Sequence, residues 1–110
     1  MKNEIKKLEK MRAEICRKIA TLGDMRKGSV SRVQRPCNKS ACGCRKDGHP
    51  GHGPYYYWTY KDNGKTVTRQ FPEGEESRKI ISEIENYKQF RALVKRMIEV
   101  NERLCELRGV

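Results

Sequence analysis

Residues 55–71, YYYWTYKDNGKTVTRQF, are rich in aromatic and β-branched residues on both sides of the dipeptide Asn63-Gly64. Such residues favour strands, and Asn-Gly between two strand-like runs is the strongest short-range signal for a two-residue β-hairpin. The sequence therefore predicts two antiparallel strands, at roughly 55–61 and 65–71.

The stretch GSVSRVQR, residues 28–35, is a candidate third strand of the same small antiparallel sheet. Successive side chains of a strand point to opposite faces. The aromatic run is thereby divided into one face with Tyr56, Trp58 and Tyr60 and another with Tyr55 and Tyr57. We expect the face with three aromatic residues to pack against helices and the other face to lie outside, with core packing as the alternative for each ring.

Helical periodicity flanks the sheet on both sides. Between residues 5 and 22 the apolar residues are spaced three or four apart, and Gly23 ends this pattern. A longer pattern follows FPEGEES, residues 71–77, where proline and glycine are helix breakers and the acidic residues suit a helix N-terminus. Cys16 and Cys105 are placed on the apolar faces of the two helices and are expected to be small buried residues.

The second helix carries a coiled-coil-like pattern. One heptad position holds Ile80, Tyr87, Val94 and Asn101, and the other holds Phe90, Met97 and Leu104. A buried Asn101 would fix register or oligomeric state, and a solvent-facing Asn101 is an equal alternative. The predicted seam consists of Ile80, Ile84, Tyr87, Val94, Met97, Ile98, Asn101 and Leu104. It would pair with a second chain, giving a homodimer, or with the first helix of the same chain.

Three cysteines and two histidines lie close together in the loop PCNKSACGCRKDGHPGHGP, residues 36–54. Cys3His is one of the usual closed structural ligand sets of zinc, whereas an iron cluster usually takes four thiolates. We therefore predict that Zn²⁺ is bound by Cys37, Cys42, Cys44 and one histidine, with unliganded thiols as the alternative. His52 would tie the loop directly to the hairpin, and His49 is the alternative fourth ligand.

The predicted fold class is α+β, with an N-terminal helix, a small antiparallel sheet with a zinc-binding loop, and a long C-terminal helix that forms a coiled-coil-like hairpin or dimer seam. The single domain divides into a basic helix (1–27), a zinc-loop and β-hairpin module (28–72) and the long helix (73–110). These segments carry nine, eight and eight Lys and Arg against four, two and eight Asp and Glu. The formal net charge of +11 therefore arises in the first two segments, which suggests a surface that faces a polyanion.

The loop and hairpin combine basic residues with exposed tyrosines, a pattern typical of surfaces that stack on unpaired bases. RNA or single-stranded nucleic acid is favoured over duplex DNA, because no helix has the features of a recognition helix. The predicted contact residues are Arg32, Arg35, Lys39, Arg45, Lys46, Tyr55, Tyr57, Lys61, Lys65 and Arg69. From a different class, the alternative is a coiled-coil adaptor or small structural subunit of a larger protein assembly.

Other functional classes lack support in the sequence. A closed Cys3His site leaves zinc no open position for catalysis. The sequence also shows no paired carboxylates in the loop, no phosphate-binding glycine loop and no Ser-His-Asp spacing, so we expect no enzyme. No segment approaches the ~18 apolar residues of a membrane span, and the start has no secretory core. We expect a soluble, cytoplasmic protein without a membrane partner.

These motifs resemble a family of small prokaryotic proteins of unknown function over roughly residues 28–107. The family shares a Cys-x4-Cys-x-Cys loop, His-Gly-Pro followed by tyrosines, a short hairpin with Gly-Lys, and a long helix with an Asn-Tyr pair. Here the pattern falls on Cys37, Cys42, Cys44, His52, Gly53, Pro54, Tyr55, Tyr56, Tyr57, Gly64, Lys65, Asn86 and Tyr87. The resemblance favours His52 as the fourth ligand and implies an association with transposases and other mobile elements. The expected function is thus a zinc-stapled basic nucleic-acid-binding protein that is part of a mobile-element-type nucleoprotein.

Overall fold

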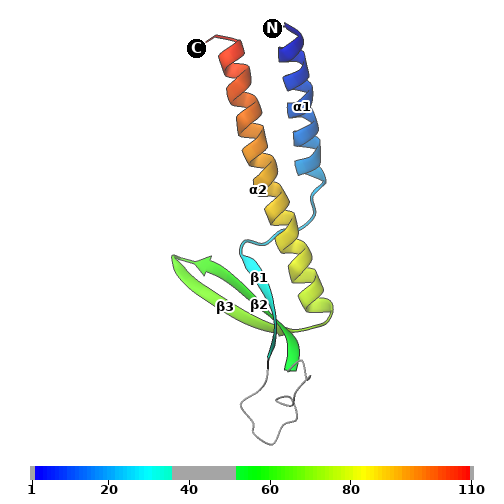
Figure 1. Cartoon of the computed structure of the whole chain (residues 1–110), viewed down its shortest axis with the longest axis vertical. Coiled ribbons are helices and arrows are strands. Elements are labelled where there is room, and N and C mark those ends of the chain that lie inside the picture. The colour runs from blue at the N-terminus through cyan, green and yellow to red at the C-terminus, as the bar shows by residue number, and fades with distance from the viewer. Residues whose placement is uncertain (1, 36–51, 110) are drawn as a thin grey trace, which may run out of the picture. The chain divides into compact units, whose positions relative to one another are not determined.

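The computed structural model describes residues 2–35 and 52–109. The elements follow in the order α1 (Lys2–Thr21), β1 (Ser29–Arg35), β2 (His52–Asp62), β3 (Lys65–Pro72) and α2 (Glu75–Leu107) (Figure 1). The predicted α+β class, with a helix, a small antiparallel sheet and a long second helix, is confirmed. Neither described helix combines the length and the apolar character needed to cross a membrane.

The chain forms two compact units. Residues 1–24 and 85–110 make up one, here called the helical unit, and residues 25–84 make up the other, called the sheet unit. Helix α2 contributes to both, with its first turns in the sheet unit and its remainder in the helical unit.

The predicted hairpin is confirmed and joins β2 to β3 through a two-residue turn. Asn63 and Gly64 have φ angles of 50° and 80°. Positive φ at both central residues is what a type I′ turn requires, and Asn-Gly adopts it at low cost. Asp62 pairs with Lys65 across this turn, and the two strands stay in register as far as Tyr55 opposite Pro72.

The candidate third strand is also present, as β1. The sheet order is β1-β2-β3 and both pairs are antiparallel. The register shifts between Val33 and Arg35, and Arg35 then pairs with His52. Arg35 and His52, the described residues on either side of 36–51, therefore lie at neighbouring positions of the sheet.

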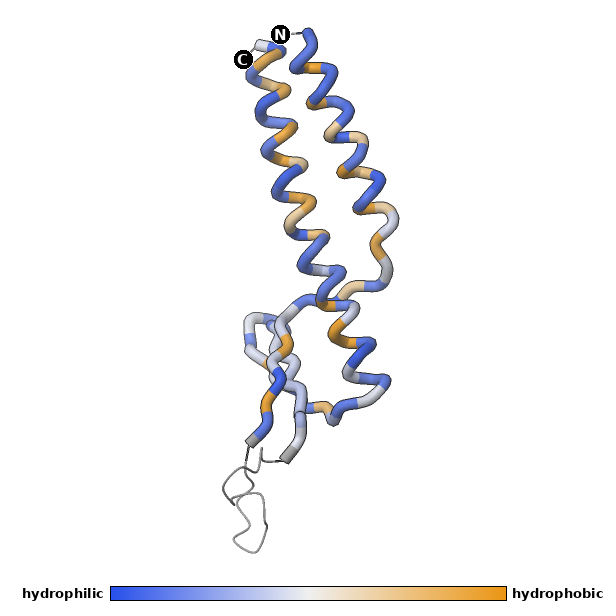
Figure 2. Tube along the Cα trace, turned by 45° about the vertical axis from the view of Figure 1, so that its right-hand side comes forward, coloured by the Kyte–Doolittle hydropathy of each residue, from blue (hydrophilic) through white to orange (hydrophobic). Residues whose placement is uncertain are grey.

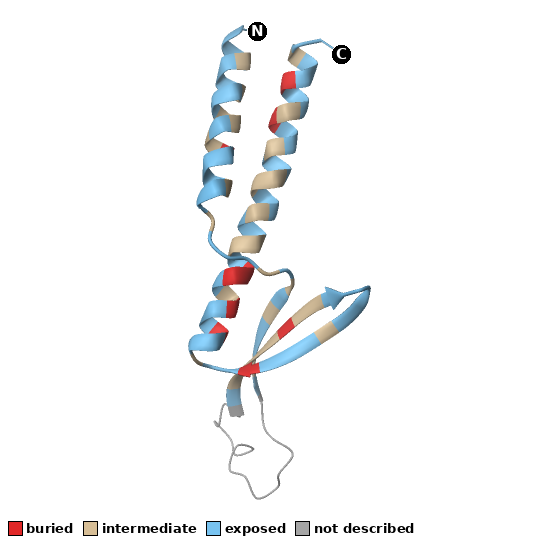
Figure 3. Ribbon diagram, turned by 180° about the vertical axis from the view of Figure 1, so that it is seen from behind, coloured by how far each residue is buried: buried red, intermediate tan, exposed pale blue. Residues whose placement is uncertain are grey.

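One face of the sheet carries the core of the sheet unit. The buried residues are Trp58, Phe71, Ile80 and Ile84, and Val30, Tyr56 and Tyr60 pack against them. The rings of Trp58 and Tyr60 lie 4.2 Å apart between centroids. The expectation that the Trp58 face packs against a helix is confirmed, and Figure 3 marks the buried positions on the strands and on the first turns of α2 in red.

The first turn of α2 is capped by its own side chain. The Ser77 hydroxyl accepts a hydrogen bond from the Gly74 amide at 2.9 Å and donates one to the Gly74 carbonyl oxygen, also at 2.9 Å. This arrangement satisfies a backbone donor that a helix N-terminus otherwise leaves without a partner. Glu75 and Glu76 follow in the first turn, where negative charge is favourable. The helix start predicted from FPEGEES therefore has a local cause.

The segment that leads into β1 is held against the sheet unit by backbone groups. Trp58 Nε1 donates a hydrogen bond to the Lys27 carbonyl oxygen at 2.9 Å. The Arg26 amide donates to the Glu83 carbonyl oxygen at 3.1 Å. Gly28 has a φ of 115° and leaves no room for a Cβ beside Trp58. A residue with a side chain at this position would meet both a strained backbone and a steric conflict.

The helical unit is an antiparallel pair formed by α1 and the later turns of α2. Ile15, Val100 and Leu104 are buried, and Ile5, Leu8, Met11, Ile19, Leu93 and Met97 pack against them. Figure 2 shows the apolar residues in orange, recurring along both helices. The seam between the two helices is therefore formed within one chain.

Polar contacts fix the register of this helix pair. Arg12 Nη1 donates to Asn101 Oδ1 at 3.0 Å. Where the start of α1 lies beside the end of α2, Arg103 Nε is 3.1 Å from Glu4 Oε1. Hydrogen bonds to Glu106 and Glu4 raise the pKa of Arg103.

Asn86 holds the opposite end of the helix pair. Its Nδ2 donates to the Asp24 carbonyl oxygen at 2.8 Å, just beyond the end of α1. The Asn-Tyr pair noted in the sequence thus has a structural role for its first residue.

The two helical cysteines correct one expectation. Cys16 and Cys105 are free and exposed, not buried. Each follows a buried residue, Ile15 and Leu104 respectively. One residue turns the side chain by about 100° around a helix, and this step takes both cysteines off the face that joins α1 to α2.

Candidate nucleic-acid interface

The strand register assigns the polar residues of the sheet to two faces. The face opposite Trp58, here called the tyrosine face, consists of Ser29, Ser31, Val33, Tyr55, Tyr57, Thr59, Lys61, Thr66, Thr68 and Gln70. The other, called the tryptophan face, consists of Val30, Arg32, Tyr56, Trp58, Tyr60, Asp62, Lys65, Val67, Arg69 and Phe71. Within the described part of the sheet unit, the first turns of α2 pack on the tryptophan face.

The tyrosine face combines two aromatic rings with hydrogen-bonding groups. Tyr55 and Tyr57 are both partly exposed. Beyond them the Thr59 and Thr68 hydroxyls lie 3.2 Å apart. The result is a row of ring, hydroxyl and ammonium groups along β2 on the side that α2 does not cover.

Lys61 supplies the cation of this face. Its Nζ donates to Thr66 Oγ1 at 2.8 Å, across the hairpin, and both side chains are exposed. The ammonium group has two further donors, because Lys carries three. It can therefore keep its threonine contact and still bind a phosphate oxygen.

Three of the predicted contact residues lie on the tryptophan face instead. Arg32 pairs with Tyr56, Arg69 with Trp58 and Lys65 with Asp62. The Arg69 guanidinium lies 5.6 Å from the centroid of the Phe71 ring. The structure therefore brings Tyr55, Tyr57 and Lys61 together and places Arg32, Lys65 and Arg69 on the opposite side of the sheet.

The predicted metal loop and its cations lie largely outside the described residues. These are Cys37, Lys39, Cys42, Cys44, Arg45, Lys46 and His49. Arg35 and His52 belong to β1 and β2, where their backbones pair. Within residues 2–35 and 52–109 no group of three or more His, Cys, Asp or Glu side chains could hold a metal ion.

The matched sequence family covers most of the sheet unit and all of the expected loop. The family described as Domain of unknown function (DUF6788) matches residues 5–80. The chain belongs to this family. A resemblance was expected over residues 28–107. The match starts earlier, within α1, and also stops earlier, in the first turns of α2. No curated protein and no solved structure matches the chain.

The predicted seam residues of this DUF6788 protein do not share one environment. Ile80 and Ile84 lie in the core of the sheet unit, and Met97 and Leu104 lie in the core of the helical unit. Val94 and Ile98 belong to neither cluster and line a shallow hollow on α2. Asn101 accepts the hydrogen bond from Arg12, and the Tyr87 ring lies 5.9 Å from the Arg91 guanidinium.

Several residues that stabilise each unit internally gave weaker signals in the sequence. Leu93 and Val100 pack against α1 although neither falls on the proposed heptad. Glu83 is buried between the two apolar positions Ile80 and Ile84, where the helical period alone predicts no carboxylate partner. Its partner Arg26 lies 57 positions earlier in the chain, in a segment without periodicity.

Proposed function

We propose that this protein binds RNA or another single-stranded nucleic acid through the tyrosine face, and that a structural zinc ion holds the adjoining loop. The observation that carries the proposal is the placement of Tyr55, Tyr57 and Lys61 on the sheet face that α2 leaves uncovered. Partly exposed rings on a sheet are suited to stack on unpaired bases, and cations beside them bind the phosphates.

The charge of this region supports the same function. Residues 28–72 carry eight Lys and Arg against two Asp and Glu. Each phosphate contact releases condensed counterions, so affinity would fall as salt concentration rises. A ring that stacks on a base contributes about 1–3 kcal/mol with little dependence on sequence. The expected activity is therefore binding with weak sequence preference and strong dependence on salt.

For the zinc ion we propose Cys37, Cys42, Cys44 and His52 as ligands, with His49 as the alternative to His52. Three thiolates and one imidazole are a donor set that suits structural zinc. The pairing of Arg35 with His52 supports the proposal, because Cys37 follows Arg35 by only two residues in the chain. A closed site of this kind would contribute folding energy to the loop that carries Lys39, Arg45 and Lys46, and it would leave the metal without a catalytic role.

An association with mobile elements remains part of the proposal. It implies that the bound nucleic acid in the cell derives from a transposable element or its transcript. Purification after nuclease treatment at low and at high salt, followed by sequencing of the copurified nucleic acid, tests this association. A random sample of cellular RNA would contradict it without affecting the proposed binding surface.

Two lysines of the hairpin give a matched test of the binding surface. Lys61 lies on the tyrosine face and Lys65 on the tryptophan face, and both are exposed. The experiment measures the affinity of Lys61→Gln and Lys65→Gln for a single-stranded oligonucleotide over a range of salt concentrations. We expect Lys61→Gln to reduce the slope of log K against log salt by about 0.7, the value for one lost phosphate contact on a single strand.

Lys65→Gln is the control for the loss of one charge from the hairpin. The proposal predicts that it changes the salt slope little. If Lys65→Gln reduces the slope and Lys61→Gln does not, the tryptophan face with Arg32 and Arg69 is the binding surface. If wild-type protein does not bind the oligonucleotide at low salt, nucleic-acid binding itself is wrong.

A further inference from the structure

The side of α1 that faces away from α2 carries a row of cations. The residues of α1 that pack in the seam with α2 are Ile5, Leu8, Met11, Ile15 and Ile19. Each residue turns the side chain by about 100° around a helix, so Lys6, Lys10 and Arg17 lie together on the side opposite the seam. All three side chains are exposed. They are here called the basic ridge.

The acidic residues of α1 do not neutralise the basic ridge. The helix carries seven Lys and Arg against three Glu. Glu4 pairs with Arg103, and Glu9 Oε2 lies 3.0 Å from Arg108 Nη2, so both carboxylates are taken up by arginines near the end of the chain. Glu14 lies on a flank of the ridge and forms no ion pair with a described residue. An excess of cations therefore remains on the outer side of α1.

The charges of α2 are arranged differently. Three of its cations form ion pairs with carboxylates three residues away, in the pairs Glu85 with Lys88, Arg96 with Glu99 and Arg103 with Glu106. No side chain of the basic ridge forms an ion pair or hydrogen bond with another described residue. Lys6 and Lys10 are four residues apart, a spacing at which like charges destabilise a helix. The ridge is thus unfavourable for α1 alone, and a polyanion bound across it would relieve the repulsion.

The basic ridge has the length and the chemistry for contact with a phosphate backbone. From Lys6 to Arg17 it spans about 16 Å, at 1.5 Å per residue. A duplex carries one phosphate per about 3.4 Å on each strand, so several phosphates fall within this length. Because α1 contains no aromatic residue, unpaired bases have no ring on which to stack. Only the phosphate contribution remains, and it is larger for a duplex than for a single strand.

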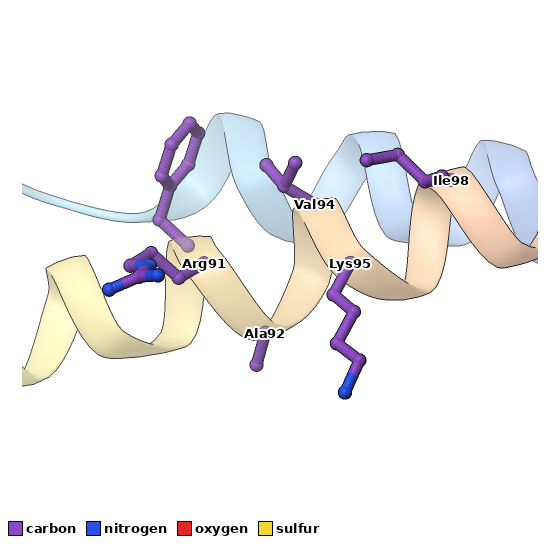
Figure 4. Close-up of a pocket in the computed structure, with 6 residues that line it drawn as sticks. Arg91, Ala92, Val94, Lys95 and Ile98 are labelled. Carbon is purple, nitrogen blue, oxygen red and sulfur yellow. The ribbon is translucent and has the colours of Figure 1, made fainter.

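An anionic membrane surface fits the basic ridge less well. A helix that lies on a membrane buries an apolar face beside its cations. The large apolar residues of α1 pack in the seam instead. The exposed Ile98 belongs to α2, and Figure 4 shows it with Val94 on one side of that helix and Lys95 on the other. The outer side of α1 therefore offers charge but no apolar surface that could enter a bilayer.

We infer that the basic ridge binds the phosphate backbone of a nucleic-acid duplex without reading its bases. The inference goes beyond the proposed function, which places an unpaired strand on the tyrosine face of the sheet unit. It does not rest on that function, because every residue that carries it belongs to the helical unit. The chain would thereby have one surface for paired and one for unpaired nucleic acid.

The test measures binding of the full-length chain, purified free of nucleic acid, to a blunt-ended duplex DNA over a range of salt concentrations. The ridge variant carries Lys6→Gln, Lys10→Gln and Arg17→Gln. Each lost phosphate contact reduces the slope of log K against log salt by about 0.9 on a duplex, so we expect a total reduction of about 2 to 3. Helix content by circular dichroism should stay unchanged, because the three side chains are exposed and glutamine favours helices.

A matched control removes the same charge from the other helix of the helical unit. It carries Lys88→Gln, Lys95→Gln and Arg96→Gln, and these side chains are also exposed. The control variant has the same net charge as the ridge variant and should change the slope little. The ridge variant should show a similar loss with a duplex RNA of the same sequence, because the contacts are to phosphates.

Several results would overturn the inference. The wild-type protein could fail to bind either duplex at low salt, or the ridge variant could keep the wild-type slope. Equal reductions in the ridge and control variants would show that only net charge matters. A loss confined to one of the two duplexes would contradict recognition through phosphates alone. Binding to phosphatidylserine vesicles that the ridge variant loses, with duplex binding unchanged, would assign the ridge to a membrane.

The comparison of Lys61 with Lys65 is made on a single strand and concerns the sheet unit. None of the results with duplexes changes its outcome. Failure of this inference and failure of the proposed function are therefore distinguishable.

Discussion

Arg26 Nε lies 3.0 Å from Glu83 Oε1, and the same guanidinium lies 5.0 Å from the centroid of the Trp58 ring. The Glu83 side chain is 12% exposed and that of Arg26 is 34% exposed. Glu83 Oε1 is buried and accepts no hydrogen bond from the described residues, so the attraction of Arg26 is its main compensation. The segment before β1 is therefore coupled to α2 by a charge that is costly to leave alone.

This coupling predicts an asymmetry between the two partners. Arg26→Ala leaves a buried carboxylate without its cation and removes the contact with Trp58, so we expect a loss of roughly 1–3 kcal/mol in the free energy of unfolding. Glu83→Gln keeps the shape and removes the buried charge, so its loss should be smaller. Trp58 is the single tryptophan, and its fluorescence during denaturant unfolding reports on the sheet unit.

Glu85→Gln is the matched control for the loss of one carboxylate. Glu85 forms an exposed pair with Lys88 at 3.6 Å, and such pairs contribute little. Equal losses for Arg26→Ala and Glu85→Gln would show that the buried carboxylate is compensated by water instead.

Asn86 provides a second test, in the helical unit. Its amide donates to the Asp24 carbonyl oxygen, so Asn86→Ala should cost about 1 kcal/mol. Asn86→Asp should cost more at neutral pH, because it replaces the donor by a charged acceptor facing a carbonyl oxygen. Far-UV circular dichroism during denaturant unfolding follows this unit. The role of the amide would be refuted if the aspartate variant were as stable as wild type.

Alanine substitutions at Gly28 and Gly64 distinguish the cost of backbone strain from the cost of a steric conflict. Both have positive φ, but a Cβ on Gly64 meets nothing within 4 Å, whereas one on Gly28 would collide with Trp58. We expect Gly64→Ala to cost about 1 kcal/mol and Gly28→Ala roughly 2–4 kcal/mol. Thermal and chemical unfolding monitored by Trp58 fluorescence measure both. Similar values for the two variants would indicate that the segment before β1 shifts freely.

Tyr55 and Tyr56 are neighbours on opposite faces of β2, and this alternation predicts opposite effects of the same substitution. Tyr55→Leu should weaken binding to a single strand by about 1–3 kcal/mol and change stability little. Tyr56→Leu removes a ring that packs against the core, so it should lower stability and leave the affinity of the folded protein unchanged. Binding and unfolding are measured on both variants. A stable Tyr55→Leu variant with wild-type affinity would exclude stacking by that ring.

The cysteines allow a controlled test of the proposed zinc ion. We expect about one zinc per chain in protein purified without added metal, lost on treatment with a strong chelator. Cys42→Ser removes one proposed ligand and should lower the zinc content and loosen β1 and β2, as followed by Trp58 fluorescence. Cys16→Ser changes an exposed free thiol on α1 and should keep the zinc. Full folding and no zinc in the wild-type protein would refute the site.

Local chemistry was sufficient to predict the elements of this fold. Asn63-Gly64 set the hairpin because positive φ at two successive residues is cheap for that pair, and the alternation of aromatic residues set which face of β2 is buried. The apolar spacing in α1 and the breakers before α2 likewise depend on neighbours in the sequence. The close spacing of cysteines and histidines between Cys37 and His52 belongs to the same local level.

Tertiary structure decided which residues lie together on one surface. The register of β1 and β3 separated Arg32, Lys65 and Arg69 from Tyr55 and Tyr57, because pairing between strands fixes side-chain direction and composition does not. On α2 the choice between Leu93 and Val94 as the residue that packs against α1 depended on where α1 lies.

The sequence alone likewise does not predict the ion pair between Glu83 of α2 and Arg26 of the segment before β1. No periodicity links Arg26 to Glu83, and only folding brings their charges to 3.0 Å. The sequence by itself thus determined the local elements and the charges they carry. Long-range packing decided which of those charges form ion pairs and which apolar faces remain uncovered. The reason is that its free energy depends on contacts between residues far apart in the sequence, which neighbouring residues do not set.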